Sequence, residues 1–192
     1  DTTLHGQYTI EKYKVGLTGK HRFVEDPKFT FKKPKFKKKI NLPKASTNPR
    51  SSAYLKGRKL NPIDYYYADK FKHFCNTIKP TFESTKNDHA RIVIPLYDGE
   101  KKIIGFQGRA LDGFITPKYL TVMLSEDSPK VYGLDTIDKE KPIYIVEGPF
   151  DSSFVENSVA MCGSDVDIRT FGWSNYIWVF DNEPRNRENI GR

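Results

Sequence analysis

Two apolar runs in this chain each end in acidic residues. The first, PIYIVEGPFDSSF, occupies residues 142–154, and the second, YIWVFDNEPRN, occupies residues 176–186. Short apolar stretches at 143–146, 158–162 and 176–180 are separated by stretches that we predict to be helices, at 150–156 and 165–170. Short apolar strands that alternate with helices are typical of a parallel α/β sheet covered on both faces. The acids of both runs are therefore expected at one edge of the sheet, beyond the carboxyl ends of its strands.

Four acidic residues make up this predicted edge. Glu147 ends one strand and Asp181 ends another, while Asp151 lies one helical turn after Glu147 and Glu183 lies two residues after Asp181. Four converging carboxylates repel one another, and a divalent cation relieves that repulsion. Mg²⁺ takes one or two carboxylates and keeps its other positions for water and phosphate. The alternative is that the acids cap helices, which is common for Asp at a strand-to-helix turn.

The segment before this sheet has a different, mixed pattern. We predict a short helix that begins at Tyr54-Leu55 and ends near Gly57, another that starts at Asn61-Pro62, and a turn or helix at 130–134. Strands are predicted at 91–96, 101–109 and 119–122, with a hairpin turn at 98–100. Gly105 and Gly108 lie inside the second of these strands, where glycine indicates a bulge or a close backbone approach.

Charge is unevenly distributed along the chain. Residues 1–60 contain 16 Lys/Arg and 4 Asp/Glu, a net +12, whereas residues 61–192 contain 16 and 20, a net −4. Residues 27–52 are rich in lysine and proline and are predicted to form a flexible arm or linker. A basic arm attracts nucleic acid, although it can equally be a solvated linker. The aromatics within it, Phe29, Phe31 and Phe36, either stack on single-stranded bases or dock on the neighbouring domain.

Two further features limit the class of protein. Cys75 and Cys162 are far apart and belong to no CxxC pair, which argues against a disulfide framework or a zinc ribbon in this segment. No stretch approaches the roughly 20 apolar residues of a membrane span. A cytoplasmic setting is therefore expected, with no membrane partner. Because the chain has no initiator Met, we expect it to be an internal segment of a longer protein.

The ordered motifs of residues 90–192 resemble those of a known family. EGxxD at 147–151 followed by DNE at 181–183 is similar to the Toprim domain of primases, topoisomerases and some nucleases. The upstream blocks RIVIPLYDGEKKIIGFQGRAL, PKYLTV and KVYGL resemble the basic subdomain that precedes Toprim in bacterial-type DNA primases. The sequences VEGPFDSSFVENSVA and WVFDNEPRN are most similar to those of the primases of T-even-type bacteriophages. Over residues 1–89 the similarity is weak.

The resemblance implies an α/β fold in three parts. Residues 1–52 would form the basic segment and linker, 53–141 a basic mixed α/β subdomain, and 142–192 a Toprim subdomain that is incomplete at its C-terminus. The family's zinc-binding template reader would precede residue 1. The region that meets a replicative helicase would follow residue 192. The setting implied is the cytoplasm of an infected bacterium.

The implied activity is Mg²⁺- or Mn²⁺-dependent synthesis of short RNA primers on single-stranded DNA from ribonucleoside triphosphates. The resemblance assigns metal binding to Glu147, Asp151, Asp181 and Glu183, and catalysis to Glu147, Asp181 and Glu183. Glu183 departs from the family pattern, in which many primases have Asp. The resemblance also implies contacts with nucleic acid or nucleotide for a set of basic residues and one glycine: Arg91, Arg109, Lys118, Lys130, Gly163 and Arg185.

Two other functions remain open on the residues alone. The first is another Toprim enzyme, such as a metal-dependent nuclease or a topoisomerase, although no tyrosine among the 11 in the chain is marked as a nucleophile. The second is a non-catalytic module that binds single-stranded DNA. The retention of all four acids argues against a decayed site.

Overall fold

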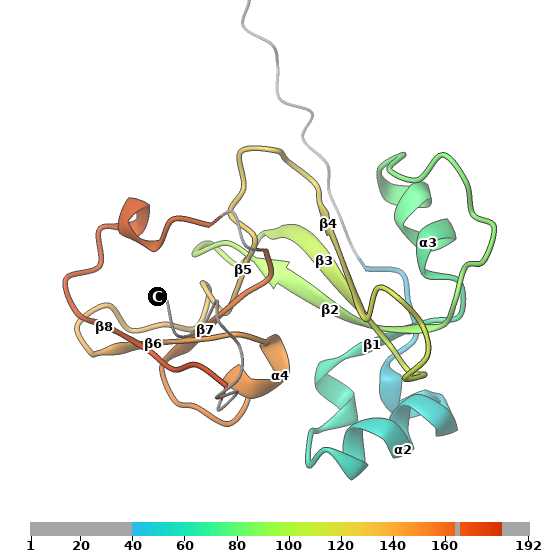
Figure 1. Ribbon diagram of the computed structural model, residues 1–192, viewed down its shortest axis with the longest axis horizontal. Helices are drawn as coiled ribbons and strands as arrows, with labels where there is room; N and C mark the ends of the chain where they lie inside the picture. The colour runs from blue at the N-terminus through green and yellow to red at the C-terminus, as the bar shows by residue number, and fades with distance from the viewer. Residues whose placement is uncertain (1–39, 164–165, 182–192) are drawn as a thin grey trace, which may run out of the picture. The chain divides into compact units, whose positions relative to one another are not determined.

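The computed structural model describes residues 40–163 and 166–181, which form two four-stranded sheets, here called sheet A and sheet B (Figure 1). In order across sheet A the strands are β1 (Tyr66–Ala68), β2 (Arg91–Tyr97), β3 (Ile103–Ala110) and β4 (Tyr119–Met123). In order across sheet B they are β5 (Val131–Tyr132), β7 (Ser158–Met161), β6 (Ile143–Val146) and β8 (Tyr176–Trp178). The helices are η2 (Ala45–Thr47), α2 (Pro49–Gly57), η3 (Pro62–Asp64), α3 (Phe71–Ile78), α4 (Pro149–Ser152) and η4 (Ile168–Phe171).

This mixture of helices and strands confirms the predicted α/β class. The predictions made for residues 1–39, for Glu183 and for Arg185 lie outside the residues that the structure describes. The same holds for the aromatic residues of the predicted basic arm.

Sheet A is antiparallel throughout, and its central hairpin is fixed by Asp98. The carboxylate oxygen Oδ1 of Asp98 accepts hydrogen bonds from the backbone N–H of Glu100 at 3.0 Å and of Lys102 at 2.9 Å. The N–H of Asp98 in turn donates to the carbonyl of Lys102 at 2.9 Å. The hairpin turn predicted at 98–100 is therefore confirmed, because an aspartate side chain closes it in the way that such turns favour.

The two faces of sheet A carry different helices, because successive side chains of a strand point to opposite faces. On one face, Gly108 of β3 lies under the ring of Phe71 in α3. A Cβ at Gly108 would come within 2.6 Å of that ring, so only glycine allows the contact. On the other face, Arg109 donates from Nε to the hydroxyl of Tyr54 in α2 at 3.0 Å. The close backbone approach predicted for Gly108 is confirmed.

Helix α2 begins earlier than predicted. The side chain of Asn48 accepts a hydrogen bond from the N–H of Ser51 and caps the helix, and Pro49 takes the first helical position, where its missing N–H has no cost. Ser51 is buried and donates from Oγ to the carbonyl of Ala45 at 2.7 Å, and Ala45 is itself fully buried. Residues 45–52 are thus packed into the fold, and the prediction that they form part of a flexible arm is wrong.

In sheet B, β6 lies between β7 and β8 and is parallel to both. The carboxyl ends of all three strands therefore meet at one edge, as the sequence predicts. The buried side chains that hold the sheet are apolar and come from the strands and η4: Val131, Ile143, Ile145, Val159 and Ile168. The sheet is nevertheless mixed, because β5 runs antiparallel to β7.

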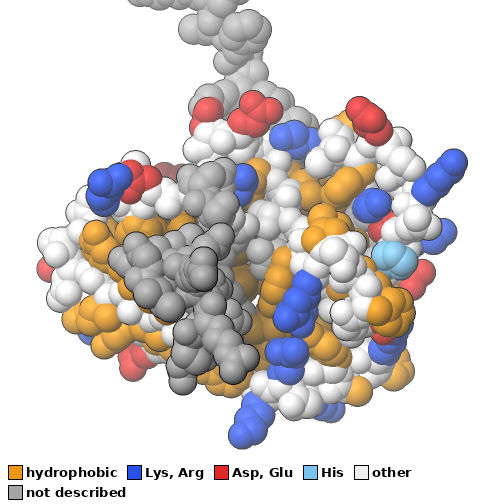
Figure 2. All heavy atoms as spheres, in the orientation of Figure 1, with side chains coloured by type: hydrophobic (Ala, Val, Ile, Leu, Met, Phe, Trp, Pro, Cys, Tyr) orange, Lys and Arg blue, Asp and Glu red, His pale blue; other side chains and the backbone are white. Residues whose placement is uncertain are grey.

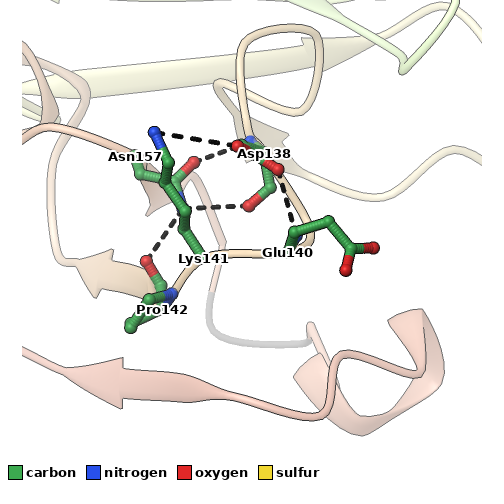
Figure 3. Close-up of polar contacts among 5 residues, drawn as sticks. All are labelled: Asp138, Glu140, Lys141, Pro142 and Asn157. Atoms are coloured by element: carbon green, nitrogen blue, oxygen red, sulfur yellow. Dashed lines mark hydrogen bonds and ion pairs between the residues drawn. The ribbon is translucent and has the colours of Figure 1, made fainter.

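Asn157 fixes the start of β6 and of β7 from outside the sheet (Figure 3). Its Oδ1 accepts from the N–H of Asp138 at 2.7 Å, and its Nδ2 donates to the carbonyls of Asp138 at 3.0 Å and Pro142 at 2.8 Å. Its own carbonyl accepts from the N–H of Tyr144 in β6 at 3.0 Å. Asn157 has a φ of 52°, a left-handed conformation that asparagine tolerates. These bonds set the register in which β6 leads toward Glu147.

Three elements of sheet B differ from their predictions. The turn or helix predicted at 130–134 is strand β5, whose pairing with β7 involves residues about thirty positions away. The helix predicted at 150–156 ends at Ser152, and the chain then turns toward β7. The helix predicted at 165–170 is a short 3-10 helix over Ile168–Phe171, capped by the side chain of Asp167. For β5, pairing with a distant strand, which the local pattern does not encode, decides the outcome.

Both cysteines are buried thiols. Burial raises the pKa of Cys75 and of Cys162 to about 12, so neither is a thiolate at neutral pH. Among the described residues no helix has the length and apolar character needed to cross a membrane.

Candidate active site

Glu147 follows β6 directly, and Gly148 is the N-cap residue of α4. The carboxylate of Asp151, in the first turn of α4, folds back against Gly148. A Cβ at position 148 would lie 2.6 Å from Oδ2 of Asp151, so the glycine leaves the space that this carboxylate occupies. Helix α4 itself is held by the buried ring of Phe150, which packs edge-on against Tyr65 at 5.4 Å. The sequence EGPFD thus places two exposed carboxylates at the end of one strand.

Asp151 and Asp181 interact electrostatically. Partial burial and then the negative charge of Asp181 raise the pKa of Asp151, while the charges of Arg58 and Arg109 lower it. Asp181 follows β8, and β8 is parallel to β6, so the acids that end the two strands meet at the same edge. Asp151 and Asp181 therefore lie at the same edge, close enough for the charge of Asp181 to raise the pKa of Asp151.

Sheet A contributes basic and aromatic side chains that face the edge of sheet B where Asp151 and Asp181 lie. Arg109 is 6% exposed and lies over the ring of Tyr119, with its guanidinium carbon 4.6 Å from the ring centroid. The pKa of Tyr119 is raised first by burial, and the charge of Asp151 adds to this, so Tyr119 lies near that carboxylate. Arg58, at the end of α2, stacks over Tyr54 with its guanidinium carbon 5.0 Å from the ring centroid. Positive charge on sheet A and α2 thus faces the carboxylates of sheet B.

A cavity of 330 Å³ lies between the two sheets beside Glu147. Its wall combines the ends of β6 and β7 with the β3–β4 face of sheet A: Gln107, Tyr119, Thr121, Glu147, Gly148, Pro149, Met161, Cys162 and Gly163. Glu147 and Gly163, both predicted as site residues, line the same cavity. A volume of this size is at the lower end of the range for small-molecule sites.

A hydrogen-bond relay in this cavity fixes the side chain of Gln107. Thr121 donates from Oγ1 to the carbonyl of Cys162 at 2.9 Å, so Oγ1 must accept from Nε2 of Gln107 at 3.1 Å. Nε2 of Gln107 therefore faces Thr121, and Oε1 points away from it. Oε1 is buried and has no hydrogen-bond partner, alone in this respect among the buried side-chain atoms that the structure describes. The relay joins sheet A to the end of β7.

The predicted basic residues occupy different positions. Arg91 is 3% exposed, and its guanidinium donates to the carbonyls of Gly108 at 3.0 Å, Pro117 at 2.9 Å and Lys118 at 3.2 Å. Burial lowers its pKa. These contacts give Arg91 a structural role on the α3 face of sheet A, away from the carboxylates. That Arg91 also contacts nucleic acid or nucleotide stays a prediction.

The two predicted lysines lie at the margins of the site. The side chain of Lys118 is exposed, just before Tyr119 at the start of β4. Lys130 is half-buried, and its side chain lines a separate cavity together with Asp167 and Thr170. Its carbonyl accepts from the N–H of Cys162 at 2.8 Å, which places its backbone near the Glu147 cavity but not its charge.

The site suits a divalent cation that keeps much of its hydration. Within residues 40–163 and 166–181, no three acidic, histidine or cysteine side chains are close enough together to hold a metal ion by themselves. Mg²⁺ commonly uses only one or two carboxylates, and phosphate or water supplies the rest. Asp151 and Asp181, whose negative charges repel one another, fit that requirement.

Sequence reasoning missed the part of the site that comes from sheet A and α2. Tyr54, Arg58, Gln107 and Thr121 were not among the predicted site residues. One signal was present for Gln107: it is a polar residue inside an otherwise apolar strand, and it lies two residues before Arg109, so it shares a face with it. Nothing in the sequence marks Tyr54 or Arg58, because their place depends on how α2 packs.

Comparison with known proteins gives one clear relative. No model of a protein family matches the chain. Over 98% of its length the chain is 32% identical to the DNA primase of enterobacteria phage T4. This chain resembles the DNA primases. It spans 57% of the length of the phage T4 primase.

Solved structures of primases show a similar fold. A DNA primase domain from Pseudomonas aeruginosa matches 78% of this chain and 61% of its own, with 22% identity and a TM-score of 0.59. The Escherichia coli primase catalytic core matches 77% of this chain and 61% of its own, with 21% identity and a TM-score of 0.56. A DnaG primase catalytic domain bound to single-stranded DNA matches 78% of this chain and 60% of its own, with 21% identity and a TM-score of 0.55. The primase resemblance drawn from the sequence motifs is confirmed.

Proposed function

We propose that this chain contains the RNA-polymerase site of a DNA primase, which joins ribonucleoside triphosphates into short RNA primers on single-stranded DNA. The observation that carries the proposal is the meeting of Asp151 and Asp181 at one sheet edge, opposite Arg109 and Tyr119, in a chain related to a phage primase. In α/β enzymes the active site commonly lies beyond the carboxyl ends of the parallel strands, which is where these acids gather.

The two sheets would divide this work. Sheet B, with its three parallel strands, is the Toprim subdomain in this proposal, and sheet A with α2 and α3 is the basic subdomain. Because β5 pairs with β7, the Toprim part would start in this proposal at about Val131 and not at residue 142. Residues 1–39 would remain the basic arm.

Glu147, Asp151 and Asp181, joined by Glu183, would hold Mg²⁺ or Mn²⁺. When bound, such an ion neutralises the charge that develops on the transferred phosphoryl group and on the leaving pyrophosphate. Gly148 leaves the space in which the Asp151 carboxylate lies, and Phe150 anchors the helix that carries it. Glu147 lines the same cavity as Gly163, a position that suits either a metal ligand or a proton acceptor.

The basic residues of sheet A and α2 would bind the phosphates. Arg109 is held by Tyr54 and by the ring of Tyr119, so its guanidinium is oriented before substrate arrives. Arg58 lies on the same side, close enough to Asp151 to lower its pKa. Charge-assisted hydrogen bonds from arginine to phosphate are among the stronger polar contacts. Positioning of this kind supplies much of the rate in phosphoryl transfer, in which a 3′-hydroxyl attacks the α-phosphorus and pyrophosphate leaves.

The partners in this proposal are a single-stranded DNA template, ribonucleoside triphosphates and a replicative helicase. The phage T4 relative is a DNA primase, and one structural neighbour is a primase domain bound to single-stranded DNA. The expected setting remains the cytoplasm of an infected bacterium.

Primer synthesis tests the proposal. The protein is incubated with single-stranded DNA, labelled ribonucleoside triphosphates and Mg²⁺, beside the variants Glu147→Gln and Asp181→Asn. Glu156→Gln is the matched control, because Glu156 is exposed and does not line the cavity. Short RNA from the wild type and the control alone supports the proposal. Equal RNA from all four proteins, or DNA cleavage without nucleotide that both site variants abolish, contradicts it, and the second result indicates a nuclease.

A further inference from the structure

Gln107 lies in the middle of β3 and has one polar atom that the fold does not use. The residue is 4% exposed, and its Nε2 donates to Oγ1 of Thr121 at 3.1 Å. Oε1 is buried and accepts no hydrogen bond from the residues that the structure describes. An apolar side chain of similar size at this position would avoid the cost of burying an unpaired oxygen. Because exceptions to hydrogen-bond pairing concentrate at functional sites, Oε1 indicates a role in binding.

The neighbours of Gln107 fix the orientation of its amide. The hydroxyl of Thr121 has one hydrogen and donates it to the carbonyl of Cys162 at 2.9 Å. If Oε1 took the place of Nε2, no hydrogen would remain for the contact between Gln107 and Thr121, so the amide does not turn over. All three residues line the cavity beside Glu147. The wall of that cavity therefore contains a hydrogen-bond acceptor whose direction is set before a ligand arrives.

Gln107 shares a face of β3 with Arg109, for which we propose a contact with phosphate. Residues two apart in a strand are separated by about 7 Å, and their side chains point the same way. In a nucleoside triphosphate the ribose hydroxyls lie at a similar distance from the α-phosphate, whereas the amino groups of the bases lie farther away. Figure 2 shows further Lys and Arg side chains in a row on the half of the molecule formed by sheet A and α2, which would attract the phosphates to this side. A nucleotide held at Arg109 thus brings its sugar to Gln107.

We propose that Oε1 of Gln107 accepts a hydrogen bond from a ribose hydroxyl of the nucleotide in the Glu147 cavity. Gln107 is then a specificity-determining residue, which favours nucleotides that carry this hydroxyl. The inference rests on the proposed function, because it takes this cavity to be the nucleotide site. Oε1 is closed to solvent in the free chain, so the hydroxyl reaches it only when neighbouring side chains move apart. The half-buried thioether of Met161 lines the cavity and is flexible enough to move in this way.

The burial of Oε1 makes its hydrogen bond to a ligand more favourable than usual. Folding has already removed water from this oxygen, so only the ribose hydroxyl loses water on binding, whereas most hydrogen bonds require both partners to lose it. A nucleotide that lacks the hydroxyl leaves the acceptor unpaired. Sites that pair a substrate hydroxyl with a buried polar group discriminate against the analogue without it. We expect Kd to differ about tenfold between the two ligands, the size of one hydrogen bond to a buried partner.

Equilibrium binding tests the inference separately from primer synthesis. ATP, 2′-deoxy-ATP and 3′-deoxy-ATP are titrated into the protein by calorimetry, with Mg²⁺ and without DNA. At least one deoxy analogue should bind the wild type about tenfold more weakly than ATP, and its identity shows which hydroxyl Gln107 contacts. Gln107→Met, which keeps the length of the side chain and removes the amide, should bind ATP and that analogue equally. Ile103→Met, at the start of the same strand and outside the cavity wall, is the matched control and should keep the wild-type difference.

Thermal unfolding of the same variants distinguishes this role from a structural one. Gln107→Met loses the hydrogen bond to Thr121 but also the unpaired oxygen, so its Tm should not fall below that of the wild type. A lower Tm with an unchanged difference in Kd would show that Gln107 only supports the fold, and would overturn the inference. Gln107→Leu, which also lacks the amide, answers the same question if Gln107→Met is unfolded.

Two binding results would also overturn the inference. The first is equal affinity of the wild type for all three nucleotides, which would leave the proposed function standing. The second is a wild type that binds no nucleotide at all, which would refute the proposed nucleotide site and this inference together. The two failures are therefore distinguished by the ATP titration alone.

Discussion

Gly148→Ala should weaken metal binding without lowering the stability of the fold. The new Cβ would lie 2.6 Å from Oδ2 of Asp151, whereas ordinary contact begins at 3.4 Å, so the carboxylate must retreat by the difference, 0.8 Å. Metal sites hold their ligands to within about 0.2 Å, and Mg²⁺ is stricter than most ions. We therefore expect Mn²⁺ affinity to fall roughly 10- to 100-fold, the loss usual when a group that orients a metal ligand is disturbed.

The same substitution should not destabilise the protein. Gly148 has a φ of −130° and a ψ of 148°, which alanine adopts freely. Replacing glycine at such a position stabilises by about 0.4–1 kcal/mol through the unfolded state, which raises Tm by roughly 2–4 °C per kcal/mol in a chain of this size. Isothermal titration with Mn²⁺ and thermal unfolding measure the two effects. Gly113→Ala, where a Cβ meets nothing within 4 Å, is the control. Wild-type Mn²⁺ affinity in Gly148→Ala, beside a clear loss in Asp151→Asn, would refute this reasoning.

Three further predictions concern the scaffold and the charge of the site. Gly108→Ala brings a Cβ to 2.6 Å from the ring of Phe71, and this overpacking should lower the free energy of unfolding by about 1–3 kcal/mol in a urea titration. Arg91→Met leaves three carbonyls without a charged donor and should cost about 2 kcal/mol or more in the same assay, with a normal free energy of unfolding contradicting its structural role. Asp181→Asn should lower the pKa of Asp151, because a negative charge that opposes ionisation is removed, and an unchanged pKa in a carboxyl NMR titration would contradict the interaction.

The strand ends of sheet B could be predicted from sequence, because both signals are local. An apolar run followed by an acid marks where a buried strand reaches solvent, and this placed Glu147 and Asp181 correctly after β6 and β8. Gly108 was predictable for a similar reason, since a glycine within a strand has few uses other than a bulge or a close approach.

The sequence did not disclose the features that depend on distant contacts. Strand β5 is two residues long and exists because it pairs with β7. Arginine commonly binds phosphate at protein surfaces, so the sequence favoured that role for Arg91. In the structure Arg91 is buried, and its guanidinium donates to backbone carbonyls. Likewise Tyr54 meets Arg109 across 55 positions of sequence, a contact that only the packing of α2 on sheet A creates.

The central claim is that the carboxylates at the ends of β6 and β8 hold catalytic metal opposite Arg109. Its most direct test is an anomalous difference map from crystals of the protein soaked in MnCl₂. The account predicts a peak at ligand distance from at least two carboxylates among Glu147, Asp151 and Asp181, and its loss in crystals of Asp181→Asn. A peak elsewhere with these three carboxylates unligated, or one that persists unchanged in the variant, would contradict it.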